Sequence, residues 1–235
     1  MTLLNISPFA ISRWGAFFNH FDLFFKGFLY TLGISFGALL LALILGILSG
    51  GLSTSKSKVG KLISRIYVEV FQNTPLLVQM VFVYYGLAII SNGHVMISAF
   101  FTAVLCVGLY HGAYISEVIR SGIEAVPKGQ TEAALAQGFT YLQVFIIIIF
   151  PQAFRKMLPA IISQFVTVIK DTSLLYSVIA IQEIFGKSQI LMGRYFEAGQ
   201  VFTLYAIITA VYFITNFIIS SFSRKLSKRW EQATE

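Results

Sequence analysis

The sequence predicts an all-α polytopic membrane protein with five spanning helices and one short cytoplasmic helix. Hydrophobic residues make up 57% of its 235 residues and charged residues only 11%. The mean hydropathy of +0.78 is too high for a water-soluble surface, so the lipid bilayer is the expected solvent. A spanning helix needs about 20 mostly apolar residues, and several charge-free runs reach that length. We expect one transmembrane domain over residues 24–225.

The first half of the chain contains three predicted spans. The first covers residues 24–50. The following charge-free run, Val70–Ser116, is too long for one helix and is interrupted by the turn-forming residues Ser91–His94. We therefore expect two helices there, over about residues 66–90 and 96–118, joined by a short loop.

The fourth span, in the region 157–182, is predicted to be broken. Pro151 and Pro159 should interrupt helical hydrogen bonding. The sequence therefore predicts an amphipathic approach helix, a spanning helix from about Leu158 and a shorter helix from Thr172. Non-helical backbone at membrane depth is tolerated only where it is buried in protein or lines a cavity, so this region is expected to line a pathway.

The last predicted span covers residues 199–223, and the basic residues then set the orientation. Twelve of them follow the first and third spans, form the Arg155-Lys156 pair or lie in the C-terminal tail, whereas four lie on the opposite side. The positive-inside rule places the twelve in the cytoplasm. Residues 1–23, which lack the order of a signal peptide, are then extracytoplasmic and residues 226–235 form a cytoplasmic tail. The twelve are Lys56, Lys58, Lys61, Arg65, Arg120, Lys128, Arg155, Lys156, Arg224, Lys225, Lys228 and Arg229, and the four are Arg13, Lys26, Lys187 and Arg194.

Several classes of function are not expected. Cys106 is the single cysteine and lies in an apolar run, and His20, His94 and His111 share no helical spacing, so we expect no metal site. No Ser-His-Asp or paired-carboxylate set indicates catalytic residues. The basic residues flank apolar runs instead of alternating with aromatics, which argues against nucleic acid and leaves membrane lipid as the partner of the basic tail.

The chain also contains no phosphate-binding Gly-x-x-x-x-Gly-Lys-Ser/Thr loop and no acidic cluster suited to Mg²⁺ and nucleotide. Energy for transport must therefore come from another chain or from an ion gradient. A gradient-driven carrier should hold ionisable relay residues within its spans, and Lys170 and Asp171 are the only clear candidates. An ATPase partner is the favoured interpretation, with a gradient-driven carrier as the alternative.

The loop between the third and fourth spans, residues 125–139, predicts a short Ala-rich helix. Thr131 is a plausible N-cap, Glu132 suits the first turn, and Gly138 suits the left-handed C′ position. Small side chains let another surface approach closely, and Glu132 could meet a basic partner. Propensity alone favours an ordinary connector between spans.

The surrounding motifs favour a functional role for this loop over that of an ordinary connector. The loop resembles the EAA loop of ABC importer permeases. Further motifs in order resemble the polar amino acid permease family, of the histidine, glutamine and arginine type, over most of residues 24–225. The motifs are Gly129-Gln130-Thr131-Glu132-Ala133-Ala134 with Gly138 and Phe150-Pro151-Gln152-Ala153, Thr31-Leu32 with Ser35, Asn73-Thr74-Pro75-Leu76-Leu77-Val78-Gln79, Gly112-Ala113-Tyr114 with Glu117 and Arg120, and Lys170-Asp171-Thr172-Ser173-Leu174.

The resemblance implies a type I ABC importer transmembrane fold and a permease subunit of an ATP-driven amino acid uptake system in the bacterial cytoplasmic (inner) membrane. It implies two ABC ATPase subunits, a second permease copy or paralogue, and an extracytoplasmic substrate-binding protein as partners. ATP and Mg²⁺ would be bound by the ATPase, and this chain would bind no cofactor. An importer of another small solute, such as methionine or an opine, remains an alternative. The coupling helix would contact the ATPase through Gly129, Glu132, Ala133, Ala134 and Gly138.

The substrate pathway is expected around Lys170 and Asp171, because charge within a membrane is costly and usually functional. The structural alternative is a local ion pair, or Asp171 capping the helix from Thr172. A helix N-terminus at membrane depth would present Thr172 and Ser173 to a substrate carboxylate. The full set of expected pathway residues is Gln79, Ser163, Gln164, Thr167, Lys170, Asp171, Thr172 and Ser173.

Two departures from the family bear on the substrate. Many members have Asn-Glu where this chain has Ser163-Gln164, and Arg is usual at the position of Gln72. A carboxylate at position 164 would be the natural partner of a cationic side chain. Its absence favours a polar neutral or acidic amino acid over a purely basic one.

Overall fold

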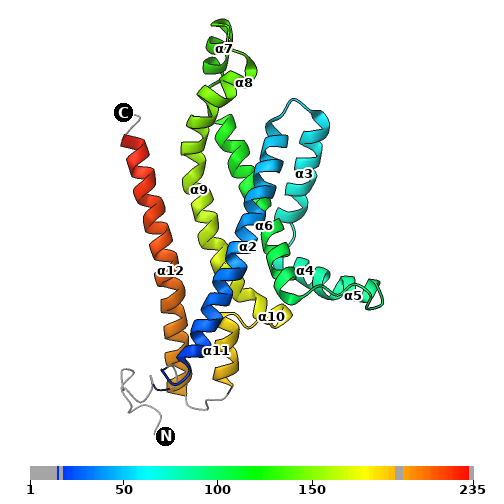
Figure 1. Ribbon diagram of the computed structural model, residues 1–235, viewed down its shortest axis with the longest axis vertical. Helices are drawn as coiled ribbons and strands as arrows, with labels where there is room; N and C mark the ends of the chain where they lie inside the picture. The colour runs from blue at the N-terminus through cyan, green and yellow to red at the C-terminus, as the bar shows by residue number, and fades with distance from the viewer. Residues whose placement is uncertain (1–14, 16–17, 194–197, 233–235) are drawn as a thin grey trace.

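The computed structural model is an elongated assembly of long helices (Figure 1), and it describes residue 15 and residues 18–193 and 198–232. Within these residues, four helical stretches are long and apolar enough to cross a membrane, or five if a bent helix pair counts as one span. The prediction of an all-helical, multi-span protein is confirmed. The long helices are α2 (Phe21–Thr54), α6 (Ala99–Glu124), α9 (Phe150–Asp171) and α12 (Ala198–Gln232).

Shorter elements connect the long helices. Some are single turns, of which two are π-helical and one is 3₁₀. They are α3 (Lys58–Gln72), α4 (Leu76–Val81), a π-helical turn (Phe82–Gly86), α5 (Leu87–Ile90), α7 (Lys128–Ala136), α8 (Tyr141–Gln143), a second π-helical turn (Val144–Ile149), a 3₁₀ turn (Thr172–Leu174), α10 (Leu175–Ile179) and α11 (Ile184–Met192).

Helices α2 and α6 form the centre of the bundle, and small residues let their backbones approach closely. A Cβ atom added to Gly108 would lie 2.7 Å from the Leu41 side chain, and one added to Gly50 would lie 2.8 Å from Ile119. Close approach through small residues is the usual way in which helices associate in lipid, where no hydrophobic force drives them together. The pair therefore provides a rigid frame for the other helices.

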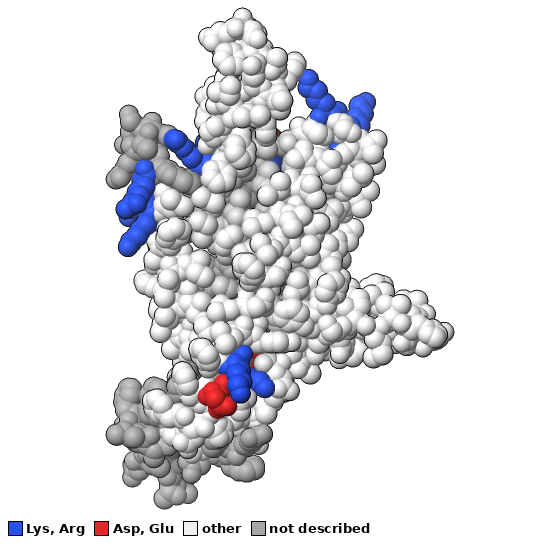
Figure 2. Space-filling view, in the orientation of Figure 1, with Lys and Arg blue, Asp and Glu red and all other residues white. Residues whose placement is uncertain are grey.

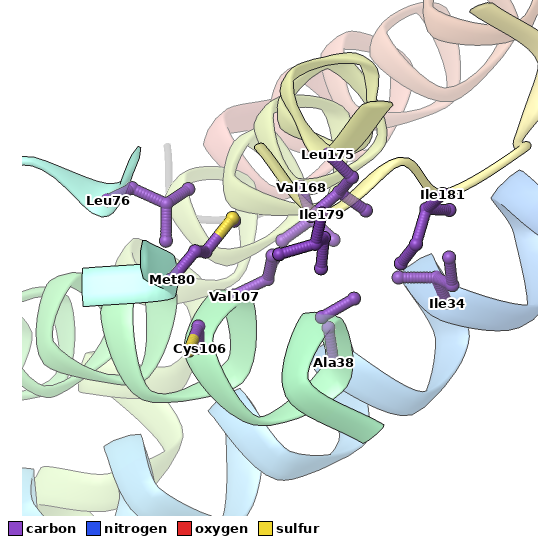
Figure 3. Close-up of a cluster of buried hydrophobic side chains, with 11 residues drawn as sticks. Ile34, Ala38, Leu76, Met80, Cys106, Val107, Val168, Leu175, Ile179 and Ile181 are labelled. Carbon is purple, nitrogen blue, oxygen red and sulfur yellow. The ribbon is translucent and has the colours of Figure 1, made fainter. Parts of the chain in front are cut away.

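A buried cluster of side chains joins five elements to this frame (Figure 3). Ile34 and Ala38 of α2 and Val107 of α6 meet Met80 of α4 and Val168 of α9, together with residues of α10. Cys106 belongs to the same cluster and is 1% exposed. The cluster fixes the end of α9 that carries the candidate pathway residues.

The second span is not the straight helix that the sequence predicts over residues 66–90. Helix α3 ends at Gln72, and the chain bends by 98° before α4 and α5, which extend sideways from the bundle (Figure 1). Pro75 explains the break, since it lacks an N–H and disfavours helical geometry in the residue before it. The predicted turn at Ser91–His94 is confirmed, with positive φ at Asn92 and Gly93.

The fourth span also differs from the prediction, because neither proline ends the helix. Residues Tyr141–Ile179 form one helical stretch long enough to cross a membrane. Pro151 lies in the first turn of α9, where a missing N–H costs little, and the π-helical turn directly before it widens the backbone. The separate approach helix and the new start near Leu158 are therefore wrong. Pro159 is accommodated inside α9, where the Ser163 hydroxyl donates to its carbonyl oxygen.

The first and last long helices extend beyond the predicted spans. Helix α2 starts at Phe21 instead of residue 24, and α12 continues to Gln232, so most of the predicted tail at 226–235 is helical. Most of the N-terminal segment 1–23, with Arg13, lies outside the described residues, as does Arg194.

Helix α11 is joined to α2 and α12 by one fully buried acid. Glu183 is 0% exposed and caps α11, accepting hydrogen bonds from the backbone N–H groups of Phe185 and Gly186 at 2.8 Å each. The Tyr212 hydroxyl of α12 donates to it at 3.0 Å. The Thr31 hydroxyl of α2 lies 3.3 Å from the same carboxyl group and accepts the Ile184 N–H at 3.2 Å. Glu183 is thus a structural residue that holds three helices together.

Candidate functional site

One face of α9 carries most of the predicted pathway residues. Ser163, Gln164, Thr167, Lys170 and Asp171 recur at helical spacing, and each is exposed or partly exposed in the single chain. Polar and ionisable side chains are expensive to place against lipid, so such a face is expected to meet a water-filled cavity or another protein. The geometry of α9 therefore places these five predicted residues on one surface.

Helix α6 holds one edge of this polar face through His111. The imidazole Nδ1 lies 3.0 Å from Gln164 Oε1, and Nε2 lies 3.1 Å from Asp171 Oδ2. His111 is 1% exposed, whereas the Asp171 side chain is 25% exposed. Asp171 therefore pairs with a histidine of another helix and not with the neighbouring Lys170, which corrects the expected local ion pair.

His111 is not among the predicted site residues, because the three histidines were considered only as possible metal ligands. The available signal was its position, since it is an ionisable residue within a charge-free apolar run, directly before Gly112-Ala113-Tyr114. An ionisable residue inside a span is a functional candidate by default.

The other edge of the polar face borders α12. Lys170 lines a cavity of about 560 Å³ with Ser173 and with Asn216 and Arg224 of α12. Ser163 lines a second, smaller cavity between the same helices, closer to the C-terminus of α12. The α9–α12 groove therefore carries polar side chains from both helices, although most of the surface of the larger cavity is apolar.

The structure does not contain the open helix N-terminus expected at Thr172. Helix α9 continues through the 3₁₀ turn into α10, and the Asp171 side chain makes no capping hydrogen bond there. The hydroxyls of Thr172 and Ser173 instead donate to the carbonyl oxygens of Ile169 and Lys170 in the preceding turn. Thr172 is fully buried, so a substrate carboxylate could not be held there by free backbone N–H groups.

Gln79 and Gln72 lie at the bend between α3 and α4. The Gln79 amide donates to the carbonyl oxygen of Phe71 and to the Thr74 hydroxyl, at 3.2 and 2.7 Å, which stabilises the broken backbone. The Gln72 amide, at the position where the family usually has Arg, donates to the Ala113 carbonyl oxygen of α6 at 3.2 Å. No described contact joins Gln79 to the polar face of α9.

A second polar surface, which the sequence analysis did not assign, lies on α3 and α6. It lines a cavity of about 570 Å³ that contains Arg65, Glu69, Glu117 and Arg120. Arg120 binds Glu117 at 2.7 Å and also Glu124 at 2.6 Å. The amphipathic pattern of α3 was the available signal, since charged residues recur there at helical spacing.

The predicted short helix after α6 is present as α7, with one corrected boundary. Pro127 is its N-cap and Thr131 lies inside the helix, so the expected cap at Thr131 is wrong. Gly138 has φ = 87° at the C′ position, as predicted. Its N–H donates to the Leu135 carbonyl oxygen, and the next N–H donates to that of Ala134, which is the Schellman pattern of a helix end.

The five predicted coupling residues divide between two sides of this segment. Gly129, Glu132, Ala133 and Gly138 are exposed, whereas Ala134 is 5% exposed and packs inward. The outer surface is therefore formed by small residues around one acid, and Ala134 supports it from beneath.

One hydrogen bond attaches α7 to α9, and residues on either side of α7 contact α9 and the turn between α2 and α3. The Gln152 amide of α9 donates to Gln130 Oε1 at 2.6 Å, and the Lys156 ammonium donates to the Ala125 carbonyl oxygen at 3.1 Å. Lys56 lies 3.7 Å above the Tyr141 ring, within the range of a cation–π contact. The bond between Gln152 and Gln130 therefore links α7 directly to α9.

Charged side chains gather at the two ends of the molecule. Figure 2 shows Lys and Arg over the α2–α3 turn and over the end of α12, at the α7 end, with a smaller charged group near α11. Lys156 also lies at the α7 end, beside Ala125. Within the described residues, no group of three or more His, Cys, Asp or Glu side chains could hold a metal ion.

Comparison with known proteins agrees with this architecture. Residues 42–232 match the family model of the binding-protein-dependent transport system inner membrane component. The chain is 34% identical to the probable glutamine ABC transporter permease protein GlnP of Bacillus subtilis, over 90% of this chain and 95% of the relative. It is 32% identical to the glutamine transport system permease protein GlnP of Escherichia coli K12, over 92% and 96%.

Solved structures show the same fold. The crystal structure of an amino acid ABC transporter with histidines matches with a TM-score of 0.80 and 32% identity, over 90% of this chain and 95% of that one. The MetNI methionine ABC transporter in an inward-facing conformation matches with a TM-score of 0.68 at 15% identity, which shows the fold alone. The type I ABC importer fold predicted from the resemblance is thereby confirmed.

These relatives are transport components that hydrolyse no ATP themselves, and the family works with separate ATPase and substrate-binding proteins. The chain belongs to the binding-protein-dependent transport system inner membrane components, as a membrane-embedded permease subunit for amino acid uptake.

Proposed function

We propose that this permease carries a polar neutral or acidic amino acid, and that α7 transmits the action of an ATPase to the polar face of α9. The observation that carries the proposal is the continuity of α9. One rigid helix is bonded to α7 near Gln152 and presents Gln164 and Asp171 toward its other end. The named substrate of two relatives, glutamine, supports a neutral polar cargo.

A second permease chain, either a copy or a paralogue, would cover the polar face of α9. A single chain leaves Ser163, Lys170 and Asp171 at least partly exposed along a spanning helix, and lipid contact with them would be costly. Two such faces, opposed across a shared axis, would enclose a water-filled pathway. The same arrangement would present two α7 helices to two ATPase subunits.

The α7 end would face the cytoplasm, and the end with α11 would face the substrate-binding protein. The excess of Lys and Arg at the α7 end supports this orientation. ATP and Mg²⁺ would bind to the ATPase subunits. Closure of the ATPase pair would move the α7 helices as rigid bodies, and α9 would carry that movement to the pathway and switch its exposure across the membrane.

Changes in the outer surface of α7 test the coupling. Glu132→Lys, or Gly138→Val at a residue with positive φ, should leave the spans folded but reduce ATP-driven uptake at least about tenfold, because one lost charge-assisted contact suffices for that. Gly93→Val is the matched control, since Gly93 also has positive φ and open space around it but lies on the turn after α5, outside the predicted coupling residues. Normal uptake by the assembled Glu132→Lys complex would overturn the role of α7.

Uptake by proteoliposomes tests the energy source and the substrate class. Transport should continue in the presence of ionophores and stop without ATP, whereas a gradient-driven carrier would behave in the opposite way. Glutamine and glutamate should compete better than arginine or lysine. Best competition by methionine or an opine would identify the alternative importer class.

A further inference from the structure

His111 holds two residues of the polar face from behind. It lies on α6, is 1% exposed, and contacts Tyr110 edge to face at a ring distance of 5.3 Å. Its two nitrogens contact Gln164 and Asp171, which are two helical turns apart on α9. A substrate in the pathway would therefore meet Gln164 and Asp171 but not the imidazole itself.

The hydrogen-bond chemistry fixes which atoms remain free. Gln164 Oε1 is an acceptor, so the imidazole nitrogen beside it, Nδ1, donates the hydrogen bond. Among the described residues, nothing accepts from Gln164 Nε2, and the second Asp171 oxygen has no partner at hydrogen-bond distance.

We propose that His111 is a positioning residue that sets substrate preference by holding the Gln164 amide through its oxygen. This inference rests on the proposed function. Held in this way, Gln164 presents an N–H donor to the pathway, which suits a substrate side chain that ends in a carbonyl or carboxylate oxygen. A cationic side chain, which also carries only donors, would find no acceptor in the Gln164 N–H group. The free oxygen of Asp171 offers the counter-charge for an α-ammonium group.

The test measures binding of radiolabelled L-glutamine and L-arginine to the purified permease–ATPase complex without binding protein, so that this chain alone sets the preference. His111→Ala should weaken glutamine binding by about tenfold while arginine binding changes little, since one oriented donor is lost. Gln164→Glu should reverse the preference, because a carboxylate presents only acceptors.

The double variant separates positioning from packing. If His111 acts through Gln164, the two substitutions are non-additive, and Gln164→Glu has a different effect in the His111→Ala chain. His111→Gln, which keeps a hydrogen-bond donor, should restore part of the preference for glutamine. This recovery would show that the effect of His111→Ala is not caused by a folding defect. His94→Ala, on the exposed turn, is the matched histidine control.

The outcomes are distinguishable. A native complex that takes up no amino acid with ATP would refute the proposed function. A native complex that transports, but whose glutamine-to-arginine ratio is unchanged by both His111 variants, would overturn the role of His111 while leaving the proposed function intact.

Discussion

Glu183 and Asp171 are two acids inside the membrane domain, and their surroundings differ in a way that separates structure from function. Glu183 is fully buried and receives hydrogen bonds from two backbone N–H groups and Tyr212, with Thr31 beside them. Among the described residues, Asp171 has one hydrogen-bond partner, His111, and a quarter of its side chain is exposed.

The comparison shows how to interpret charge in a spanning region. A buried polar group is stable only when its hydrogen bonds are satisfied within the protein, as at Glu183. An acid with few hydrogen bonds and a partly exposed side chain can still accept a hydrogen bond from a ligand, as at Asp171. The first arrangement joins three helices, and the second leaves part of the side chain open, where we propose that a substrate binds.

Glu183→Ala should have the largest effect, a loss of folded protein. It would leave the Phe185 and Gly186 N–H groups and the Tyr212 hydroxyl without their acceptor, each at a cost of about 1–3 kcal/mol. Size-exclusion chromatography of the detergent-solubilised chain measures this. Asp22→Ala, which removes an exposed acid beside Lys26 at 3.9 Å, is the control and should leave the elution profile unchanged.

Asp171→Asn should affect transport instead of folding. The amide keeps the shape of the side chain and can still accept from His111, but it removes the negative charge. ATP-driven uptake should fall at least about tenfold, since the substrate ammonium group loses a charged partner. An unfolded Asp171→Asn chain, or a folded Glu183→Ala chain that fails only in transport, would reverse the comparison.

Thr31→Val should have an intermediate effect on stability. The substitution keeps the shape but removes the hydroxyl that accepts the Ile184 N–H and lies beside Glu183. A loss of about 1–3 kcal/mol is expected from the unsatisfied buried N–H, and thermal unfolding in detergent measures it. An unchanged midpoint would mean that the capping by Glu183 alone holds α11.

Tyr212→Phe should have the smallest effect. It removes one donor to Glu183, which keeps both backbone N–H groups of α11. The expected loss is about 1 kcal/mol. Hydrogen exchange at the Phe185 and Gly186 amides should become only slightly faster, and full exposure of these amides would show that Tyr212 carries more of the network than its single bond implies.

Features that depend on nearby residues could be predicted from the sequence. The C′ position of Gly138 and the turn at Ser91–His94 follow from local backbone preferences, and both are present. The local rule for proline failed inside α9. Pro159 does not end α9, because a proline inside a membrane helix can be accommodated by local adjustment and neighbouring side chains.

Both partners of His111 were already candidate pathway residues. Asp171 was named because charge inside a span is costly, and Gln164 because of its place in the family pattern. Their link through His111 could not be predicted, since it joins α6 and α9 across a long stretch of chain, and no local pattern records that contact. The same holds for Glu183, whose four partners come from three helices.

The sequence by itself determined the solvent, the helical class, the turns and the short helix before Gly138, because these follow from hydropathy and local backbone energetics. Only the tertiary structure decided that α9 is one continuous helix, that Asp171 pairs with His111, and that Glu183 is closed off while Asp171 stays open. The physical reason is that a polar group in a membrane must find its partner somewhere in the fold, and the chain alone does not reveal which helix supplies it.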